Sequence, residues 1–493
     1  MEHKVPELKD KSLLIGKCYV NGSWVGSNTG KTFQVFDPAT NEMIGTCPEF
    51  SSSDTDKAIN AAAEAFKSFR KTLVRDRARM LRKWFDLILQ NQEDLATLIT
   101  WENGKAFSEA RGEVNYAAAF IEWFSEEAPR LYADSIPVSV PGNRVITVKE
   151  PVGVCGLVTP WNFPAAMITR KIGPALAAGC TVVAKSPGEI PFTANALAEL
   201  AHRAGIPQGV INVVTALKNT VEVGHELTNH HLIRKVSFTG STRVGKLLMS
   251  QTSSTLKRGS WELGGNAPFI VFDDVEDLDA AVSGLILSKF RGTGQTCVCA
   301  NRIYVHRSHY DEFADKLKTA VKAFRVGPGF LPGVTHGPLI HQVASDKVIA
   351  HIEDAKSKGA RVLVGGERLE HLGPSFIPPT ILTNMTHEML VASEETFGPV
   401  AALFAFDSED EVIQQANRCE VGLAAYVYTR NVQRVFRVAE ALEVGMVGIN
   451  TGIISDVASP FGGVKESGFG REGSKYGIDE FVHVKSMTLG GIV

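Results

Sequence analysis

Three consecutive segments decide the fold of this chain: VGVCGLVTP (152–160), MITRKIGPALAAG (167–179) and CTVVAKSP (180–187). The first and third are short apolar runs that predict buried strands, and the segment between them predicts a helix. The alternation continues through PFTANALAELAHRAG (191–205), VINVVTA (210–216), KVSFTG (235–240) and STRVGKLLMSQ (241–251). Buried strands that alternate with helices predict an α/β protein with a parallel, doubly wound sheet, which binds nucleotides at the carboxyl ends of its strands.

A second α/β series follows from about residue 262 to residue 460. It contains predicted strands at 267–274, 300–306, 379–382, 401–406 and 424–429, and predicted helices at 280–290 and 310–324. Ahead of both series, short strands and turns over 19–48 lead into a helical block that extends to about residue 133. A hairpin around PGN (141–143) follows, and the glycine-rich stretch 459–473 is predicted to be a loop.

The composition is that of an ordinary globular protein. Of 493 residues, 44% are hydrophobic and 21% are charged, and the net charge of −3 gives no indication of a nucleic-acid or membrane-surface partner. No apolar run could span a bilayer, and the segment MEHKVPELKDKSLLIG (1–16) lacks an apolar signal core, so we expect a cytoplasmic protein. The seven scattered cysteines suit a reducing compartment and no disulfide framework.

The segment GQTCVCANR (294–302) holds two cysteines one residue apart, Cys297 and Cys299. Cys297 ends a polar, glycine-rich stretch, RGTGQTC (291–297), where burial for its own sake is an unusual reason for a thiol. The residues alone leave two interpretations of Cys297 open, an inert packed thiol and a catalytic nucleophile.

Two further groups could serve such a nucleophile. Glu262 precedes a Gly-Gly pair and an apolar strand, a setting that would raise the pKa of its carboxyl group and suit a general base. Asn162, in the rigid turn PWNFP (160–164), could donate its side-chain N–H to an oxyanion together with the backbone N–H of Cys297. A solvated glutamate and a turn-forming asparagine are the alternatives.

Six motifs, in order along the chain, resemble the aldehyde dehydrogenase superfamily: PWNFP (160–164), FTGST (238–242), WELGGN (261–266), GQTC (294–297), EETFGP (394–399) and PFGGVKESGFGRE (460–472). The match covers nearly the whole chain. Longer stretches are most similar to the superfamily's succinate-semialdehyde dehydrogenases: AMITRKIGPALAAGCTVVAK (166–185), KFRGTGQTCVCANR (289–302) and GREGSKYGIDE (470–480).

This resemblance implies NAD(P)-dependent oxidation of succinic semialdehyde to succinate, a step of 4-aminobutyrate degradation. Other aliphatic or ω-carboxylated semialdehydes, such as glutarate semialdehyde, are the alternative substrates. The implied roles are attack on the aldehyde by Cys297, oxyanion stabilisation by Asn162 and the Cys297 backbone N–H, and activation of water by Glu262. A thiohemiacetal and then a thioester form on the cysteine.

The same resemblance implies a Rossmann-type cofactor domain, although FTGSTRVG (238–245) lacks the GxGxxG fingerprint. The implied contacts are Gly240, Ser241 and Trp161 at the pyrophosphate, Lys185 at the adenosine ribose, Glu395 at the nicotinamide ribose and Phe397 beside the nicotinamide.

One departure from the family pattern bears on cofactor choice. NAD-preferring relatives often carry a glutamate three residues after the lysine, whereas KSPGEIP (185–191) places Gly188 there and Glu189 one position later. Without that carboxylate, Lys185 and Ser186 could bind a 2′-phosphate. We therefore expect NADP in preference to NAD, and use of both is the alternative.

A substrate carboxylate demands a cationic or hydroxyl partner. The resemblance points to Arg170, Arg291 and Ser455. Arg291 lies six residues before Cys297, and Arg170 lies eight after Asn162, so both are tethered near the reacting centre. The alternative for either arginine is a surface or interface ion pair.

The resemblance also bears on Cys299. A Cys297–Cys299 disulfide would remove the thiolate reversibly, so we interpret the pair as a redox switch, and a small packing residue is the alternative for Cys299.

Other functional classes fit less well. A papain-like hydrolase needs a histidine paired with Cys297, and no sequence feature distinguishes any of the 13 histidines. A catalytically inactive binding homologue conflicts with the presence of Cys297, Glu262 and Asn162 together. HELTNHH (225–231) has Asn229 where an HExxH zinc site needs its second histidine, so we expect no metal.

The resemblance implies a division into domains. The cofactor domain comprises residues 1–128 and 150–261, and the catalytic domain comprises residues 262–462. Residues 129–149 form an oligomerisation hairpin. The tail, 463–493, returns to the cofactor domain and then joins the oligomerisation element. The end of the tail, HVKSMTLGGIV (483–493), could add an edge strand to a partner subunit, so we expect a homodimer or homotetramer. The other expected partner is the small-molecule aldehyde.

Overall fold

The computed structural model describes residues 4–492. Its first large sheet has eight strands in the order β2-β1-β9-β8-β7-β10-β11-β21, in which β1 is Cys18–Val20 and β2 is Ser23–Val25. The five central strands are parallel: β7 (Val154–Val158), β8 (Thr181–Ser186), β9 (Ile211–Thr215), β10 (Ile233–Thr239) and β11 (Arg258–Glu262). The chain winds from β7 outward to β9 and then returns to β10 on the other side, which confirms the predicted doubly wound sheet.

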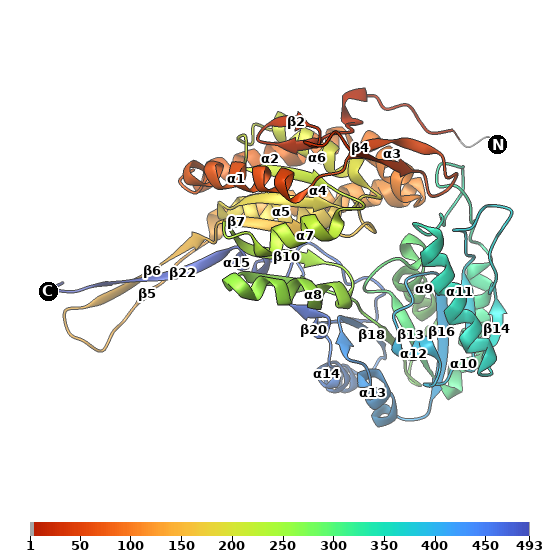
Figure 1. The fold of residues 1–493 in the computed structure, drawn as a ribbon. Coiled ribbons are helices and arrows are strands. Elements are labelled where there is room, and N and C mark those ends of the chain that lie inside the picture. Colours follow the sequence, from red (N-terminus) through yellow and green to blue (C-terminus); the bar gives the residue numbers. More distant parts are fainter. Residues whose placement is uncertain (1–3, 493) are drawn as a thin grey trace.

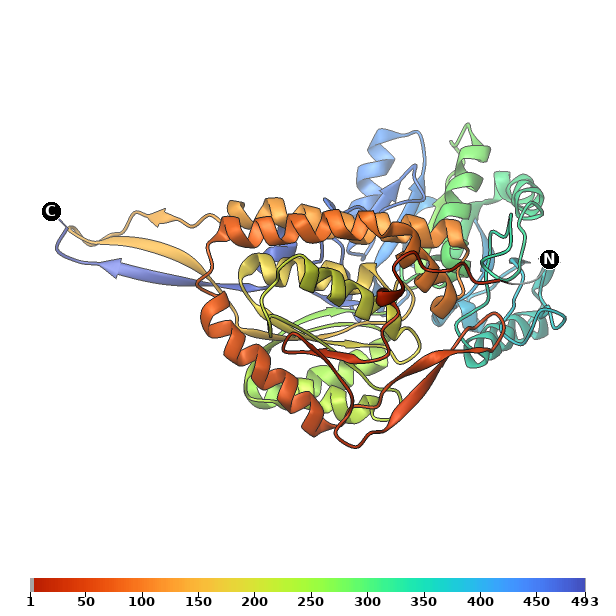
Figure 2. The same cartoon turned by 90° about the horizontal axis from the view of Figure 1, so that it is seen from above.

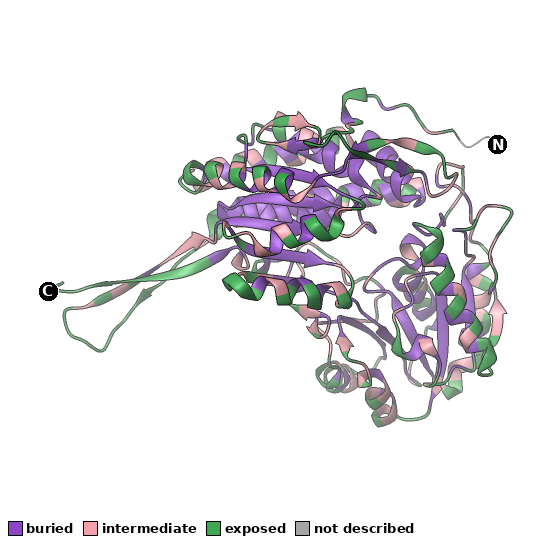
Figure 3. Ribbon diagram, viewed as in Figure 1, coloured by how far each residue is buried: buried purple, intermediate pink, exposed green. Residues whose placement is uncertain are grey.

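Helices cover both faces of this sheet. On one face, α5 (Ala166–Ala178) and α6 (Pro191–Arg203) contact the strands, and α2 (Val74–Gln90), α3 (Gln92–Asn103) and α4 (Phe107–Glu127) pack over them. On the other face lie α1 (Ser52–Phe69), α7 (Thr220–Asn229) and α8 (Thr242–Thr252). The strands are buried from both sides (Figure 3), which explains their nearly continuous apolar sequence.

The second large sheet has seven strands in the order β14-β15-β16-β13-β12-β18-β19. Its strands are β12 (Ala267–Val271), β13 (Ala300–His306), β14 (Arg361–Val364), β15 (Thr380–Thr383), β16 (Val400–Phe406), β18 (Ala424–Tyr428) and β19 (Met446–Ile449). Helices α9 (Leu278–Lys289) and α10 (Tyr310–Val321) share one core with it. Helices α11 (Gln342–Ser357), α12 (Leu390–Ser393), α13 (Glu409–Asn417) and α14 (Val432–Ala441) share the core on its other face.

A three-stranded arm projects from the body of the molecule (Figures 1 and 2). It is built from β5 (Ser135–Ile136), β6 (Arg144–Pro151) and β22 (Val482–Leu489), and β22 pairs antiparallel with β6 of the same chain. The predicted loop 459–473 contains two short strands, because β20 (Val464–Lys465) pairs with β17 (Val421–Gly422) and β21 (Gly468–Phe469) pairs with the edge strand β11. Among residues 4–492, no helix has both the length and the apolar character that crossing a membrane requires.

Candidate active site

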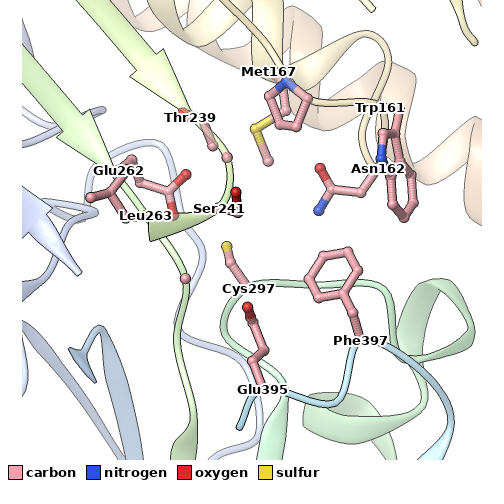
Figure 4. Close-up of a pocket in the computed structure, with 13 residues that line it drawn as sticks. Trp161, Asn162, Met167, Thr239, Ser241, Glu262, Leu263, Cys297, Glu395 and Phe397 are labelled. Atoms are coloured by element: carbon pink, nitrogen blue, oxygen red, sulfur yellow. The ribbon is translucent and has the colours of Figure 1, made fainter. Parts of the chain in front are cut away.

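A cavity of about 240 Å³ opens where the strand order of the first sheet reverses, at the carboxyl ends of β7 and β10 (Figure 4). Segments from both large sheets supply its walls. The lining residues are Pro160, Trp161, Asn162, Met167, Thr239, Gly240, Ser241, Glu262, Leu263, Gly264, Cys297, Glu395 and Phe397. None of the described histidines is among them, so the cavity offers no histidine base for a papain-like mechanism.

Cys297 reaches the cavity through a tight turn between α9 and β13. Three successive residues, Gly292, Thr293 and Gly294, have left-handed backbone with φ of 59°, 56° and 76°. A Cβ atom on Gly294 would lie 2.1 Å from the Gly398 carbonyl oxygen, so only glycine fits there. The turn leaves the Cys297 side chain partly exposed, with its sulfur directed into the cavity (Figure 4).

The surroundings of Cys297 keep its thiol protonated in the resting site. Burial raises the pKa of the Cys297 thiol well above its ordinary value, and the negative charge of Glu262 raises it further. The positive charge of Arg170 opposes this shift. Thiolate formation therefore requires a proton acceptor, such as water that enters the cavity.

Cys299 has a different environment from Cys297, although only one residue separates them. Its side chain is buried, and its Sγ donates to the carbonyl oxygen of Lys289 at 3.5 Å. Burial raises the pKa of its thiol, and the Lys289 ammonium lowers it. Both cysteines are free thiols.

Asn162 extends from the loop after β7 and is 6% exposed. Its Nδ2 donates to the carbonyl oxygen of Gln295 at 3.0 Å, in the same loop as Cys297. Its Oδ1 is buried and has no partner among residues 4–492. The amide thus stands beside the nucleophile loop, where an N–H donor to an oxyanion belongs.

Glu262 ends β11 and is 4% exposed, so the interpretation of a solvated glutamate is wrong. Its Oε2 accepts a hydrogen bond from Arg170 at 2.9 Å, and its Oε1 is buried without a partner among the described residues. Burial raises the pKa of its carboxyl group, and Arg170 partly offsets this. The free oxygen could accept a proton from water.

Arg170 is committed to a buried ion network. Its guanidinium pairs with Glu262 and with Glu472, and Lys171 pairs with Glu472 as well. Because Arg170 is 2% exposed, the alternative of a surface ion pair is wrong. Arg170 does not line the cavity, and a substrate carboxylate would compete with two carboxylates for it.

Arg291 makes no ion pair with any residue between 4 and 492. Its guanidinium stacks over the Phe163 ring, 4.9 Å from the ring centroid, so its hydrogen-bond donors are not committed to a carboxylate. Ser455 lies outside the cavity, in a separate hollow lined by loop 451–460 and β19. None of the three predicted substrate-binding residues, Arg170, Arg291 and Ser455, is among the residues that line the cavity.

Five residues expected to hold the cofactor line the cavity: Trp161, Gly240, Ser241, Glu395 and Phe397. Ser241 caps the N-terminus of α8, where its side chain accepts from the Val244 N–H, and a helix N-terminus favours phosphate. Glu395 accepts from the Gly265 N–H at 3.3 Å, and burial raises the pKa of its carboxyl group to about 7.

Lys185, Ser186 and Gly188 lie together at the end of β8, apart from the lining of the cavity. Among residues 4–492, the buried Lys185 ammonium donates only to the backbone carbonyls of Ser186 and Ala216, and burial lowers its pKa to about 8. A Cβ atom on Gly188 would lie 2.8 Å from a methyl carbon of Leu217. A side chain at position 188 would therefore require Leu217 to move.

The comparisons with known proteins agree with this geometry. Residues 24–487 match the model of the aldehyde dehydrogenase family. The chain belongs to the aldehyde dehydrogenase family. It is 58% identical over 473 residues, 96% of this chain and 95% of the relative, to succinate-semialdehyde dehydrogenase [NADP(+)] 1 of Schizosaccharomyces pombe. It is also 54% identical to glutarate-semialdehyde dehydrogenase of Pseudomonas aeruginosa, over 99% of this chain and all of that one.

A solved structure supports the same assignment. The crystal structure of an NADP-dependent enzyme of Escherichia coli superposes with a TM-score of 0.97 at 53% identity, covering 98% of this chain and all of that chain. The fold and the family of this aldehyde dehydrogenase are therefore established by independent comparisons.

Outside the cavity, His230 is the central residue of a possible ligand cluster with Asp56 and Glu226. Its Nδ1 accepts from the Leu232 N–H at 3.2 Å, so its Nε2 carries the proton and donates to Asp56 at 3.0 Å. Both ring nitrogens are thereby engaged within the protein.

Sequence reasoning missed the charges that surround this aldehyde dehydrogenase site. They are Lys105, Glu109, Glu113, Lys171 and Glu472. Glu109 and Glu113 are spaced by one helical turn, a pattern that also fits a solvated helix face. Their partners come from distant segments, so no local signal identifies them.

Proposed function

We propose that this aldehyde dehydrogenase oxidises succinic semialdehyde to succinate with NADP, and that glutarate semialdehyde is its second candidate substrate. The observation that carries the proposal is one cavity lined by Cys297, Glu262 and Asn162, with the uncommitted guanidinium of Arg291 beside the nucleophile turn. The names of the similar proteins support both substrates and NADP.

The proposed mechanism assigns one task to each side chain. Cys297 gives its thiol proton to water, and its Sγ bonds to the aldehyde carbon. The amide of Asn162 and the backbone N–H of Cys297 donate to the oxyanion. When bound, the nicotinamide would supply the hydride acceptor. Glu262 then takes a proton from water, hydroxide adds to the Cys297 thioester, and the acid leaves as the thiolate is released.

Arg291 is the proposed principal partner of the substrate carboxylate. A substrate carboxylate would compete for Arg170 with Glu262 and Glu472, the two carboxylates that already pair with its guanidinium. Ser455 could contact it only if its loop approached the cavity. The roles of Arg170 and Ser455 stay predictions.

The residues around β8 fit NADP. The ammonium of Lys185 has no carboxylate partner within 4.0 Å among the described residues, so it is available to a phosphate. Ser186 is adjacent, and Gly188 offers no carboxylate where NAD-preferring relatives carry one for the ribose, while a side chain there would require Leu217 to move. We propose these three residues as the site of the 2′-phosphate.

Initial rates test the proposed function. We expect reduced-cofactor formation with succinic semialdehyde and NADP to give the highest kcat/KM, followed by glutarate semialdehyde, with butyraldehyde well below both. Replacement of NADP by NAD should lower kcat/KM by at least ~10-fold, the effect of about 1.4 kcal/mol. Equal rates with butyraldehyde would contradict the carboxylate assignment, and a preference for NAD would contradict the cofactor assignment.

The remaining proposals concern assembly and regulation. Exposed apolar residues on and beside the arm, among them Tyr132, Val140 and Val484, favour a homodimer or homotetramer that buries the arm. We also propose the domain boundaries predicted from the sequence and a cytoplasmic location. The redox switch also stays a prediction, and it requires the Cys299 thiol to leave the Lys289 carbonyl.

A further inference from the structure

Two glutamates at the start of α4, the half-buried Glu109 and the buried Glu113, each contact a different catalytic loop. Glu113 Oε1 accepts from the backbone N–H groups of Ala165 and Ala166 at 2.8 Å and 3.4 Å, immediately after the Asn162 turn. Glu109 Oε1 accepts from the Gly292 N–H at 2.8 Å, in the left-handed turn that presents Cys297. One turn of helix thus contacts both loops.

Lys105, just before α4, completes this arrangement. Its ammonium donates to Glu113 Oε2 at 2.5 Å and to the carbonyl oxygen of Asn162 at 2.8 Å, and it is 4% exposed. It also lies 4.3 Å from the centroid of the Phe163 ring, over which Arg291 stacks as well. The Asn162 turn is therefore held by charged hydrogen bonds, which are stronger than neutral ones.

The only direct hydrogen bond between the side chain of Asn162 and the nucleophile loop, within residues 4–492, is its Nδ2 bond to Gln295 O. The Asn162 amide nitrogen carries two hydrogens, so one can stay on the Gln295 carbonyl oxygen while the other donates to the oxyanion. This single neutral link is weaker than the charged hydrogen bonds that Lys105 and Glu109 make to the two loops. The contacts made by α4 do not use any group of the reaction, so they persist through turnover.

We propose that Lys105, Glu109 and Glu113 form a brace that positions loop 160–166 and loop 291–297 relative to each other during catalysis. The inference rests on the proposed roles of Asn162 and Cys297. The three are positioning residues, since none of them lines the cavity. A displacement of about 1 Å between donor and nucleophile is enough to cost ~100-fold in rate.

The test compares two reactions of Cys297 that need neither cofactor nor semialdehyde. Acylation by p-nitrophenyl acetate passes through an oxyanion, whereas alkylation by iodoacetamide displaces iodide without one. In Lys105→Met we expect the acylation burst to slow by ~100-fold and alkylation to change by less than ~3-fold. Parallel loss of both rates, or unchanged acylation, would overturn the proposal.

Three further variants separate positioning from stability. Lys235→Met removes another buried lysine, paired with Glu480 at 3.4 Å and distant from the cavity lining. It should lower the melting temperature but change the ratio of the two rates by less than ~3-fold. Glu109→Gln keeps an acceptor for the Gly292 N–H and should retain acylation, whereas Glu109→Ala should lose it. Equal acylation in the two Glu109 variants would also contradict the brace.

Different results would refute the proposed function and the proposed brace. If Cys297→Ala still shows the acylation burst, the nucleophile assignment is wrong, and the proposed function fails with it. If that variant is inactive and Lys105→Met reacts like the wild type, only the brace is wrong.

Discussion

Arg170 and Arg291 share one prediction, contact with a substrate carboxylate, but they have opposite environments. Arg170 lies on α5 between two buried carboxylates, and its charge is neutralised within the protein. Arg291 lies on a turn and stacks on an aromatic ring without any ion pair among the described residues. An arginine close to a catalytic residue in sequence is thus not always free to bind a substrate carboxylate, because a buried charge first requires a partner within the protein.

The largest expected effect is on stability. Arg170→Met leaves Glu262 and Glu472 without their shared cation, and breaking a buried ion pair in this way costs about 3–5 kcal/mol. Arg291→Met breaks no ion pair and should cost less than about 1 kcal/mol. Urea unfolding of both variants measures the difference. Equal losses would show that the two arginines are energetically alike.

The next effect concerns substrate selection. Arg291→Met should lower kcat/KM for succinic semialdehyde by ~10–100-fold, because a hydrogen bond to a charged group contributes about 1.5–3 kcal/mol. Its kcat/KM for butyraldehyde should change by less than ~3-fold, since that aldehyde has no carboxylate. Initial rates with both aldehydes provide the measurement. A uniform loss with both aldehydes would mean that Arg291 supports the turn and does not bind substrate.

A third prediction concerns Glu395, a half-buried carboxylate without an ion pair among residues 4–492. Burial raises its pKa to about 7, so it gains its charge between pH 6 and pH 8. If it accepts hydrogen bonds from the nicotinamide ribose, KM for NADP should fall by roughly 5-fold over this range, because an ionised acceptor is stronger. Glu395→Gln should abolish the dependence. A pH-independent KM in the wild type would exclude this contact.

Ionisation of Glu395 should strengthen cofactor binding but lower the stability of the folded protein. Its folded-state pKa lies above the ordinary glutamate value of 4.5, so the folded protein binds the proton more tightly than the unfolded chain. The contribution of Glu395 to the free energy of unfolding is therefore largest at low pH and declines as pH rises from about 4.5 to about 7. Glu395→Gln should remove this part of the pH dependence.

The smallest effect concerns the second thiol. Cys299→Ala should retain turnover within ~2-fold of wild type, because Cys299 lies behind the loop and touches no reacting group. If the pair is a redox switch, peroxide inactivation of the wild type should be reversed by dithiothreitol more completely than that of Cys299→Ala. Full peroxide sensitivity in the variant, with sulfenylation excluded by a dimedone probe, would contradict the switch.

Strands β11, β14, β19 and β21 were not predicted. Local sequence did predict strands β7 to β10, β12, β13, β15, β16 and β18 and the motifs that meet at the cavity, because buried parallel strands and rigid turns leave local patterns. It did not predict the charge network. The Arg170–Glu262 bond joins residues 92 apart, and the Lys171–Glu472 bond joins residues 301 apart. Such pairings depend on how segments pack in three dimensions, so residue type and spacing along the chain could not distinguish Arg170 from Arg291.

Mass spectrometry of a trapped intermediate tests the central claim most directly. Glu262→Gln should acylate but hydrolyse slowly, because an amide cannot take a proton from water. After mixing with succinic semialdehyde and NADP and a rapid acid quench, we predict a succinyl thioester on the peptide that contains Cys297, assigned to Cys297 by fragmentation and equal in amount to the NADPH formed. An adduct on Cys299, or NADPH formation without any adduct on Cys297 at the earliest time points, would contradict the account.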